Sequence, residues 1–221
     1  MTNATTKKDV LACIKPYVTV SEKNKKIGKI GNFSLPPVKG CTKHCVHCMS
    51  YCYARPIYSR FPTARYAWDK NLATVKKSLP RFEESLGIFL SIYKGTFFRI
   101  HVSGDFFSQD YLEAWFRIIK TSKVKFFAFT RAYDLDWTIK PSNLKRIWSV
   151  DDKNIDAVPN DGTSRAYVTE VGDIRKPTRK GEKVFECLCN SGKYDADECT
   201  HCGYRCAKMS NRWSVNFTKH N

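Results

Sequence analysis

Four cysteines fall within twelve residues of the chain: Cys41, Cys45, Cys48 and Cys52. Thiolates that lie this close together in sequence can surround one soft metal centre. Zinc sites usually combine two ligand pairs that are far apart in the chain, whereas four thiols in one tight loop favour an iron–sulfur ligand set. We therefore predict a metal centre in this loop, and an iron–sulfur cluster rather than structural zinc.

The spacing of the first three cysteines, C-x3-C-x2-C, resembles the cluster loop of radical S-adenosylmethionine (SAM) enzymes. The resemblance implies that Cys41, Cys45 and Cys48 hold a [4Fe–4S] cluster whose fourth iron is open to SAM. The loop departs from that pattern at His47, where the family usually has an aromatic residue, and at Cys52, an additional thiol. If Cys52 ligated the fourth iron, the cluster would be closed to SAM.

A second cysteine group lies near the end of the chain, with the spacing C-x-C-x9-C-x2-C-x3-C. Its members are Cys187, Cys189, Cys199, Cys202 and Cys206. A segment of about forty residues is too short for an independent hydrophobic core, so we expect a second metal centre to hold it together. Five thiols exceed the four that one site needs, and the spacing leaves either Cys187 or Cys189 as the spare one.

The composition indicates a basic protein that can bury a core. The 221 residues include 38 Lys and Arg against 21 Asp and Glu, a formal net charge of +17. This balance favours a polyanionic partner such as DNA or RNA, although a basic surface can also serve solubility alone. Nine of ten cysteines lie in the two groups, which favours metal ligation in a reducing cytoplasm over disulfides. No apolar run approaches the length of a membrane span, so we expect no membrane partner.

The chain divides into three predicted parts. Residues 1–26 form a basic, loosely attached arm, residues 27–171 an α/β core, and residues 172–221 a charged linker followed by the second cysteine group. Within the core, apolar periodicity predicts helices over 64–78, 81–93 and 110–120, the last with Asp110 as its N-cap. Strands are predicted over 27–37, 96–108, 123–132, 144–151 and 164–171. This alternation predicts a parallel α/β sheet.

Several segments of the stretch 41–206, about three-quarters of the chain, resemble the phage gene product eighty-eight family. The matching segments are Cys52-Tyr53-Ala54, RIHVSGDFFSQDYLEAW (99–115), FFAFTRAYDL (126–135) and CTHCGYRC (199–206). The family is regarded as radical-SAM-like. The two resemblances together imply a partial (β/α) barrel of radical-SAM type with a small C-terminal segment held by metal.

Radical-SAM enzymes bind the amino group of SAM with a Gly-Gly-Glu type motif at the end of the second strand. Ser103, Gly104 and Asp105 lie at the end of the second predicted strand here, so Gly104 would let the backbone approach the ligand and Asp105 would accept from the ammonium. The alternative is a strand-to-helix turn in which Ser or Asp caps the next helix. Further candidate SAM contacts at predicted strand ends are Thr130, Arg131, Ser149 and Asp151.

Three histidines, His44, His47 and His201, lie inside the cysteine loops and could ligate iron or donate hydrogen bonds to cluster sulfurs. Thiols are already plentiful, which makes ligation the weaker of the two roles. His101 lies within the predicted strand 96–108 and is expected to be a packed residue rather than a base.

These observations favour a radical-SAM-like enzyme that generates a 5′-deoxyadenosyl radical to modify or repair nucleic acid, with flavodoxin or ferredoxin as reductant. Basic residues interleaved with aromatic ones could follow phosphates and stack on bases, or form an ordinary solvated helix face. They are Arg55, Arg60, Arg65, Lys70, Lys76 and Lys77, with Tyr53, Tyr58, Tyr66 and Trp68. One alternative is a non-catalytic iron–sulfur protein that binds nucleic acid. Another is a metal-dependent nuclease using Asp105, Asp134, Asp136 and Asp151.

Overall fold

A computed structural model describes residues 6–22, 27–41, 46–170, 173, 177–187, 199, 202–203 and 205–218. In these ranges the strands form one eight-stranded sheet with the order β1-β2-β3-β4-β5-β6-β8-β7. Their bounds are β1 (Val20–Ser21), β2 (Gly31–Phe33), β3 (Phe97–Ile100), β4 (Lys125–Thr130), β5 (Leu144–Val150), β6 (Arg165–Thr169), β7 (Lys183–Glu186) and β8 (Trp213–Thr218). Neighbouring strands are parallel except for the antiparallel pair β1 and β2.

From β2 to β6, each strand lies beside the strand that precedes it in the chain. The registers pair Ile100 of β3 with Ala128 of β4, and Thr130 of β4 with Trp148 of β5. Because these strands are parallel, their carboxyl ends meet at one edge of the sheet. The α/β class predicted from the sequence is confirmed, and the partial barrel of radical-SAM type stays a prediction.

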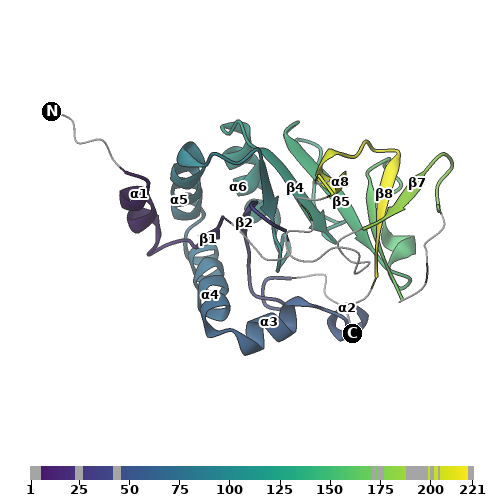
Figure 1. Ribbon diagram of the computed structural model, residues 1–221, viewed down its shortest axis with the longest axis horizontal. Helices are drawn as coiled ribbons and strands as arrows, with labels where there is room; N and C mark the ends of the chain where they lie inside the picture. Colours follow the sequence, from purple (N-terminus) through teal and green to yellow (C-terminus); the bar gives the residue numbers. More distant parts are fainter. Residues whose placement is uncertain are drawn as a thin grey trace.

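The helices precede and connect these strands. They are α1 (Lys7–Ile14), α2 (Val46–Ser50), α3 (Ala54–Arg60), α4 (Pro62–Lys77), α5 (Leu79–Ile92), α6 (Gln109–Lys120), the 3-10 helix η1 (Ile155–Ala157) and α8 (Arg205–Lys208). Figure 1 shows α1, α4, α5 and α6 on the same side of the molecule, with α3 leading from α4 toward α2. None of the helices in the described ranges is long and apolar enough to cross a membrane.

One face of the sheet packs against the helices through large aromatic side chains. Phe98 of β3 and Phe126 of β4 have ring centroids 5.6 Å apart, and Trp115 of α6 lies 6.3 Å from Phe98 and 5.4 Å from Phe82 of α5. All four rings are at most 1% exposed. Each buries roughly 150–250 Å² of mostly apolar surface, so this layer provides a large part of the hydrophobic stabilisation.

The opposite face of the sheet carries the alternate residues of the same strands. Phe127 and Phe129 of β4 point to this face, because successive side chains of a strand alternate. They pack with residues of the second cysteine group, including Cys199 and Cys206. The second cysteine group therefore lies against the sheet rather than apart from it.

The described part of the predicted arm differs from a loose attachment. Residues 7–14 form α1, which has a capping box between Thr6 and Asp9. Ile14 and Val18 are 3% and 1% exposed and belong to the main hydrophobic core. The segment is thus attached by a few apolar side chains, with Leu11 and Val20 also packed against the core, and so sparse an apolar pattern gives little signal in the sequence.

The C-terminal part also differs from a separate segment held only by metal. β8 lies between β6 and β7 in the sheet, and it pairs Val215 with Ala166 of β6. Val215 is 1% exposed. The residues after 172 therefore complete the sheet, and the shortage of apolar residues in this segment is met by the shared core.

The predicted helices and the later predicted strands are confirmed within a few residues at either end. The exceptions lie around β2 and β3. β2 covers only Gly31–Phe33 of the predicted 27–37. β3 covers only Phe97–Ile100 of the predicted 96–108, and the N-cap of α6 is Ser108, not Asp110. Ser108 accepts from the backbone N–H of Tyr111, a bond that Asp110 cannot make because it already lies inside the helix.

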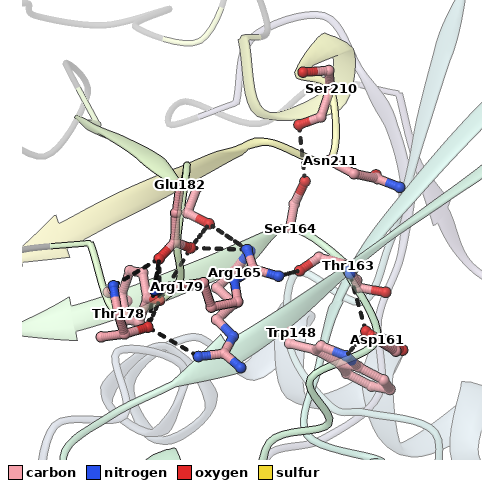
Figure 2. A network of polar contacts seen from close by, with 12 residues as sticks. Trp148, Asp161, Thr163, Ser164, Arg165, Thr178, Arg179, Glu182, Ser210 and Asn211 are labelled. Atoms are coloured by element: carbon pink, nitrogen blue, oxygen red, sulfur yellow. Dashed lines mark hydrogen bonds and ion pairs between the residues drawn. The ribbon is translucent and has the colours of Figure 1, made fainter.

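A buried polar network joins the segment before β7 to β6 and β8 (Figure 2). Glu182, 8% exposed, accepts from Ser214 Oγ at 2.5 Å, from Arg179 Nη2 at 2.9 Å and from the Thr178 backbone N–H at 2.9 Å. Burial alone would raise the pKa of Glu182, but these donors outweigh it and lower the pKa to about 2. The carboxylate thus stabilises the fold while it is ionised.

This network predicts acid sensitivity. Because the folded pKa lies below the ordinary value of 4.5, Glu182 contributes stability above pH 4.5 and loses it as the pH falls toward 2. We expect Glu182→Gln to lower the free energy of unfolding at pH 7 by roughly 2–3 kcal/mol, and by much less at pH 3. Urea unfolding at both pH values measures this difference. The exposed Glu84→Gln is the control, and an equal loss at both pH values would contradict the ionised role.

Candidate functional site

A pocket lies between the first cysteine loop and the carboxyl ends of the strands. Its lining includes Cys41, Cys48 and Cys52, and six of the seven predicted SAM contacts, namely Ser103, Gly104, Asp105, Thr130, Arg131 and Ser149. The inner face of the sheet contributes Arg99, Phe129, Ala166, Val168 and Phe217. Segments more than one hundred residues apart in the chain thus converge on one cavity.

Close backbone packing positions the cysteine loop against the turn after β3. The Leu35 N–H donates to the Ser103 carbonyl at 2.9 Å, and the Asp105 N–H donates to the Gly40 carbonyl at 2.8 Å. Gly104 has φ of +87°, and a Cβ there would lie 2.6 Å from the Leu35 Cβ. Gly104 is therefore required because a larger residue would not fit against Leu35. The sequence had instead suggested that Gly104 lets a ligand approach the backbone.

Asp105 connects the ends of β3 and β4. Its carboxylate accepts from Thr130 Oγ1 at 2.6 Å and from the backbone N–H groups of Arg131 and Phe106, each at 2.8 Å. Burial raises the pKa of Asp105 to about 6, although these donors oppose the rise. The carboxylate faces the pocket, but three donors of the chain already occupy much of its capacity for an ammonium.

Tyr51, Arg131 and Asp151 form a buried triad that fixes the cysteine loop to the ends of β4 and β5. Arg131 Nη1 lies 2.7 Å from Asp151 Oδ2, and both groups contact the Tyr51 hydroxyl, which donates to Asp151 at 2.5 Å and accepts from Arg131 at 2.6 Å. Arg131 and Asp151 are 8% and 3% exposed. Asp151, the seventh predicted SAM contact, is outside the pocket lining and acts on it through Arg131.

The described thiols of the first loop influence one another electrostatically. Burial, with smaller contributions from the charges of Asp105, Cys52 and Cys48, raises the pKa of Cys41 to about 12. A thiolate in this position needs a nearby cation, which is the environment a metal would provide. Among the described side chains, no three His, Cys, Asp or Glu residues converge into a metal site, and Cys45 lies outside the described residues.

In the second cysteine group, too, the pKa of a thiol is raised where it packs against the sheet. Burial raises the pKa of Cys206 to about 12, with Cys199, Cys187 and Cys202 as contributing neighbours and Arg99 opposing. Cys206 packs on the face formed by Ile147, Ala166 and Val215. Four of the five predicted thiols are thus neighbours, while Cys189 lies outside the described residues.

Arg99 is a charged pocket residue that the sequence did not indicate. It lies on β3, lines the pocket, and its guanidinium carbon is 5.0 Å from the Phe129 ring centroid. Its Nε and the Ser103 Oγ are buried without a hydrogen-bond partner among the described residues. The available signal was the alternation along Phe97–Ile100, which places residue 99 opposite the apolar Phe98 and Ile100.

A family model described as Gene product 88 matches residues 6–213. The chain belongs to the gene product 88 family. This confirms the family resemblance inferred from the sequence, while the radical-SAM classification stays a proposal.

Two curated relatives of the gene product 88 family come from mycobacteriophages. A stretch of 78 residues is 41% identical to the Gene 88 protein of Mycobacterium phage D29 and covers 32% of either chain. A stretch of 120 residues is 32% identical to the Gene 88 protein of Mycobacterium phage L5 and covers 48% of either chain. The chain thus matches less than half the length of these relatives. No solved structure matches it.

The candidate histidines and the four candidate nuclease aspartates of this gene product 88 protein differ in burial and in contacts. His101 is 2% exposed, its Nε2 lies 2.8 Å from the Tyr111 hydroxyl, and burial lowers its pKa to about 3, so it is a packed residue, as expected. His47 contacts the Tyr51 ring, and His44 and His201 lie outside the described residues. The four nuclease candidates divide between the site and solvent: Asp105 and Asp151 belong to the site, whereas Asp134 and Asp136 are exposed.

The buried triad predicts an unequal response to substitution. We expect Asp151→Asn to lower the free energy of unfolding by about 3 kcal/mol, because Arg131 would be left as an uncompensated buried cation. Tyr51→Phe should cost about 1–2 kcal/mol through its two hydrogen bonds. Urea unfolding measures both, with Tyr66→Phe, at an exposed ring, as the control for the tyrosine. Equal stability of Tyr51→Phe and Tyr66→Phe would contradict the proposed attachment of the loop.

Proposed function

We propose that this protein is a radical-SAM-like [4Fe–4S] enzyme that modifies or repairs a nucleic acid. One observation carries the proposal: thiols of the C-x3-C-x2-C loop and the polar ends of parallel strands line the same pocket. Ligands of α/β proteins bind at the carboxyl ends of parallel strands, so the pocket is where a cofactor would be expected.

The donor chemistry of the loop fits an iron–sulfur cluster. Cys41, Cys45 and Cys48 would hold it. The pKa of Cys41 is raised mainly by burial and further by neighbouring negative charges, and a bound metal would favour its thiolate against both effects. A cluster of this kind supplies one-electron reductive cleavage of SAM to methionine and a 5′-deoxyadenosyl radical, with flavodoxin or ferredoxin as electron donor.

The residues of the chain would bind and orient the ligand. Ser103 Oγ and Arg99 Nε are buried polar atoms without a partner in the described residues, and the residues that carry them line the pocket. Such atoms cost free energy unless a ligand or water satisfies them. Ser103 would donate to a ligand oxygen, and the Arg99 guanidinium would pair with an anionic group. The apolar side chains of Phe129, Val168 and Phe217 would exclude water from the reaction.

The nucleic acid part of the proposal rests on charge. A formal charge of +17 attracts polyanions and raises their local concentration at the pocket. Arg131 contributes little to this attraction because Asp151 neutralises it at 2.7 Å. Arg99 belongs to no carboxylate ion pair in the described part of the chain, so it is the cation available to an anionic ligand in the pocket.

A second candidate is a non-catalytic iron–sulfur protein that binds nucleic acid. Cys52 lines the same pocket as Cys41 and Cys48, so a fourth thiol is placed where it could close the cluster. Asp105 also has three donors from the chain, which leaves less capacity for SAM. The two candidates differ in whether the fourth iron is open.

Electron paramagnetic resonance on reduced protein, purified without oxygen, distinguishes the two candidates. We expect SAM to change the cluster signal and 5′-deoxyadenosine to accumulate. Cys48→Ala should reduce its formation at least ~100-fold by removing a cluster ligand, whereas the exposed Cys13→Ala should leave it unchanged.

The Cys52→Ala variant tests closure of the cluster. A SAM-dependent signal that appears only in Cys52→Ala would favour the second candidate, with the cluster closed in the natural protein. A signal that SAM leaves unchanged in both proteins would contradict the enzyme. Zinc in place of iron, after purification from iron-replete cells, would contradict both candidates.

A further inference from the structure

The segment that leads from the cysteine loop to α4 is strongly basic. Residues 46–78 contain six Lys and Arg but a single acidic residue, Asp69. Asp69 accepts from the Tyr58 hydroxyl at 2.7 and 2.8 Å, so its charge is engaged within the segment. Arg55, Arg60 and Arg65 are exposed along α3 and the start of α4. These arginines form no ion pair with a carboxylate in the described part of the chain, so their charge is available to solvent or a partner.

Two aromatic side chains are exposed at the corner of the molecule where α3 ends and α4 begins. Phe61 is 56% exposed and Tyr66 is 71% exposed, the two largest values among the exposed large hydrophobic residues described. Phe61 occupies the N-cap of α4, where it forms no side-chain cap and where a small polar residue would stabilise the helix by about 1 kcal/mol. Neither core packing nor capping therefore explains a phenylalanine at this position.

The buried face of α4 explains why Tyr66 is exposed to solvent. The helix buries Asn71, Leu72 and Val75, and Asn71 donates to the Ser34 and Thr19 carbonyls at 2.9 and 3.0 Å. These contacts fix the rotation of α4, so the opposite side of the helix is free to present Tyr66 to solvent.

This corner is continuous with the pocket. α3 begins at Ala54, and Cys52, Tyr53 and Ala54 all line the pocket. From there the helix runs over seven residues, about 10 Å, to the corner at Phe61. Figure 1 shows α3 between α2, which carries Cys48, and α4. A flexible ligand on this corner could therefore extend into the pocket.

We propose that Arg55, Arg60, Phe61, Arg65 and Tyr66, the corner surface, bind single-stranded nucleic acid. Arginines contact the phosphates, and the two rings stack on bases, which is possible only where the bases are unpaired. The inference deepens the proposed function and rests on it for the role of the pocket, by naming a single strand as the substrate class.

The test measures binding of fluorescein-labelled twenty-nucleotide oligothymidine, oligouridine and a duplex by fluorescence anisotropy. It uses the full chain without SAM or reductant, so the result does not depend on the radical chemistry. We expect at least one of the two single strands to bind at least ~10-fold more tightly than the duplex, because the duplex offers no exposed base faces.

Two pairs of variants separate stacking from charge. Phe61→Ala/Tyr66→Ala should weaken single-strand binding at least ~10-fold, whereas Ile139→Ala, at a side chain 55% exposed between β4 and β5, should not. Arg60→Ala/Arg65→Ala should reduce the slope of log affinity against log salt by about 1.4. The control Lys120→Ala/Lys123→Ala, at exposed positions, should reduce this slope by less.

Three results would overturn the corner surface: no binding to either single strand at low salt, equal binding to the duplex, or equal losses in the test and control variants. Circular dichroism establishes that the variants, all at exposed positions, remain folded. Cleavage of SAM by a protein that binds no single strand would reject the corner surface but not the enzyme. Binding without SAM cleavage would reject the enzyme but not the corner surface.

Discussion

The geometry of the site depends on two carboxylates that follow the strands on either side of β4. Asp105 joins β3 to β4 through Thr130 and Arg131, and Asp151 joins β5 to β4 through the same Arg131. Tyr51 then attaches the cysteine loop to this pair. Buried ion pairs contribute little net stability compared with apolar packing, but breaking one is costly, so they fix one arrangement in preference to others. Here that arrangement places thiols beside polar strand ends.

The sequence predicted the components of the site better than their roles. Polar residues after buried strands were found because carboxyl ends of parallel strands share an edge, and six of the seven line the pocket. Their partners could not be read from spacing. Asp105 and Asp151 are used within the chain because their acceptor atoms meet donors from segments 26 and 100 residues away, and such pairings follow from three-dimensional packing. Gly104 likewise packs on a residue that is remote in sequence, Leu35.

The prediction for residues 172–221 was incomplete for a different physical reason. Considered alone, its apolar residues are too few for a core, so a metal was the expected source of stability. In the structure β8 enters the sheet beside β6, and Cys206 and Met209 cover the inner face of the strands. A strand that uses a core built by other segments gives a weak local signal. The same reasoning applies to α1, which attaches through Ile14 and Val18.

The inner face of the sheet also relates the two cysteine groups. Arg99 lines the pocket beside the first group, and its positive charge favours the thiolate of Cys206 in the second. The Arg99 guanidinium carbon also lies 5.0 Å from the Phe129 ring centroid, so its charge is held against the aromatic surface of the sheet. Because Arg99 lines the pocket and also favours the thiolate of Cys206, the same face of the sheet serves the pocket and the second cysteine group.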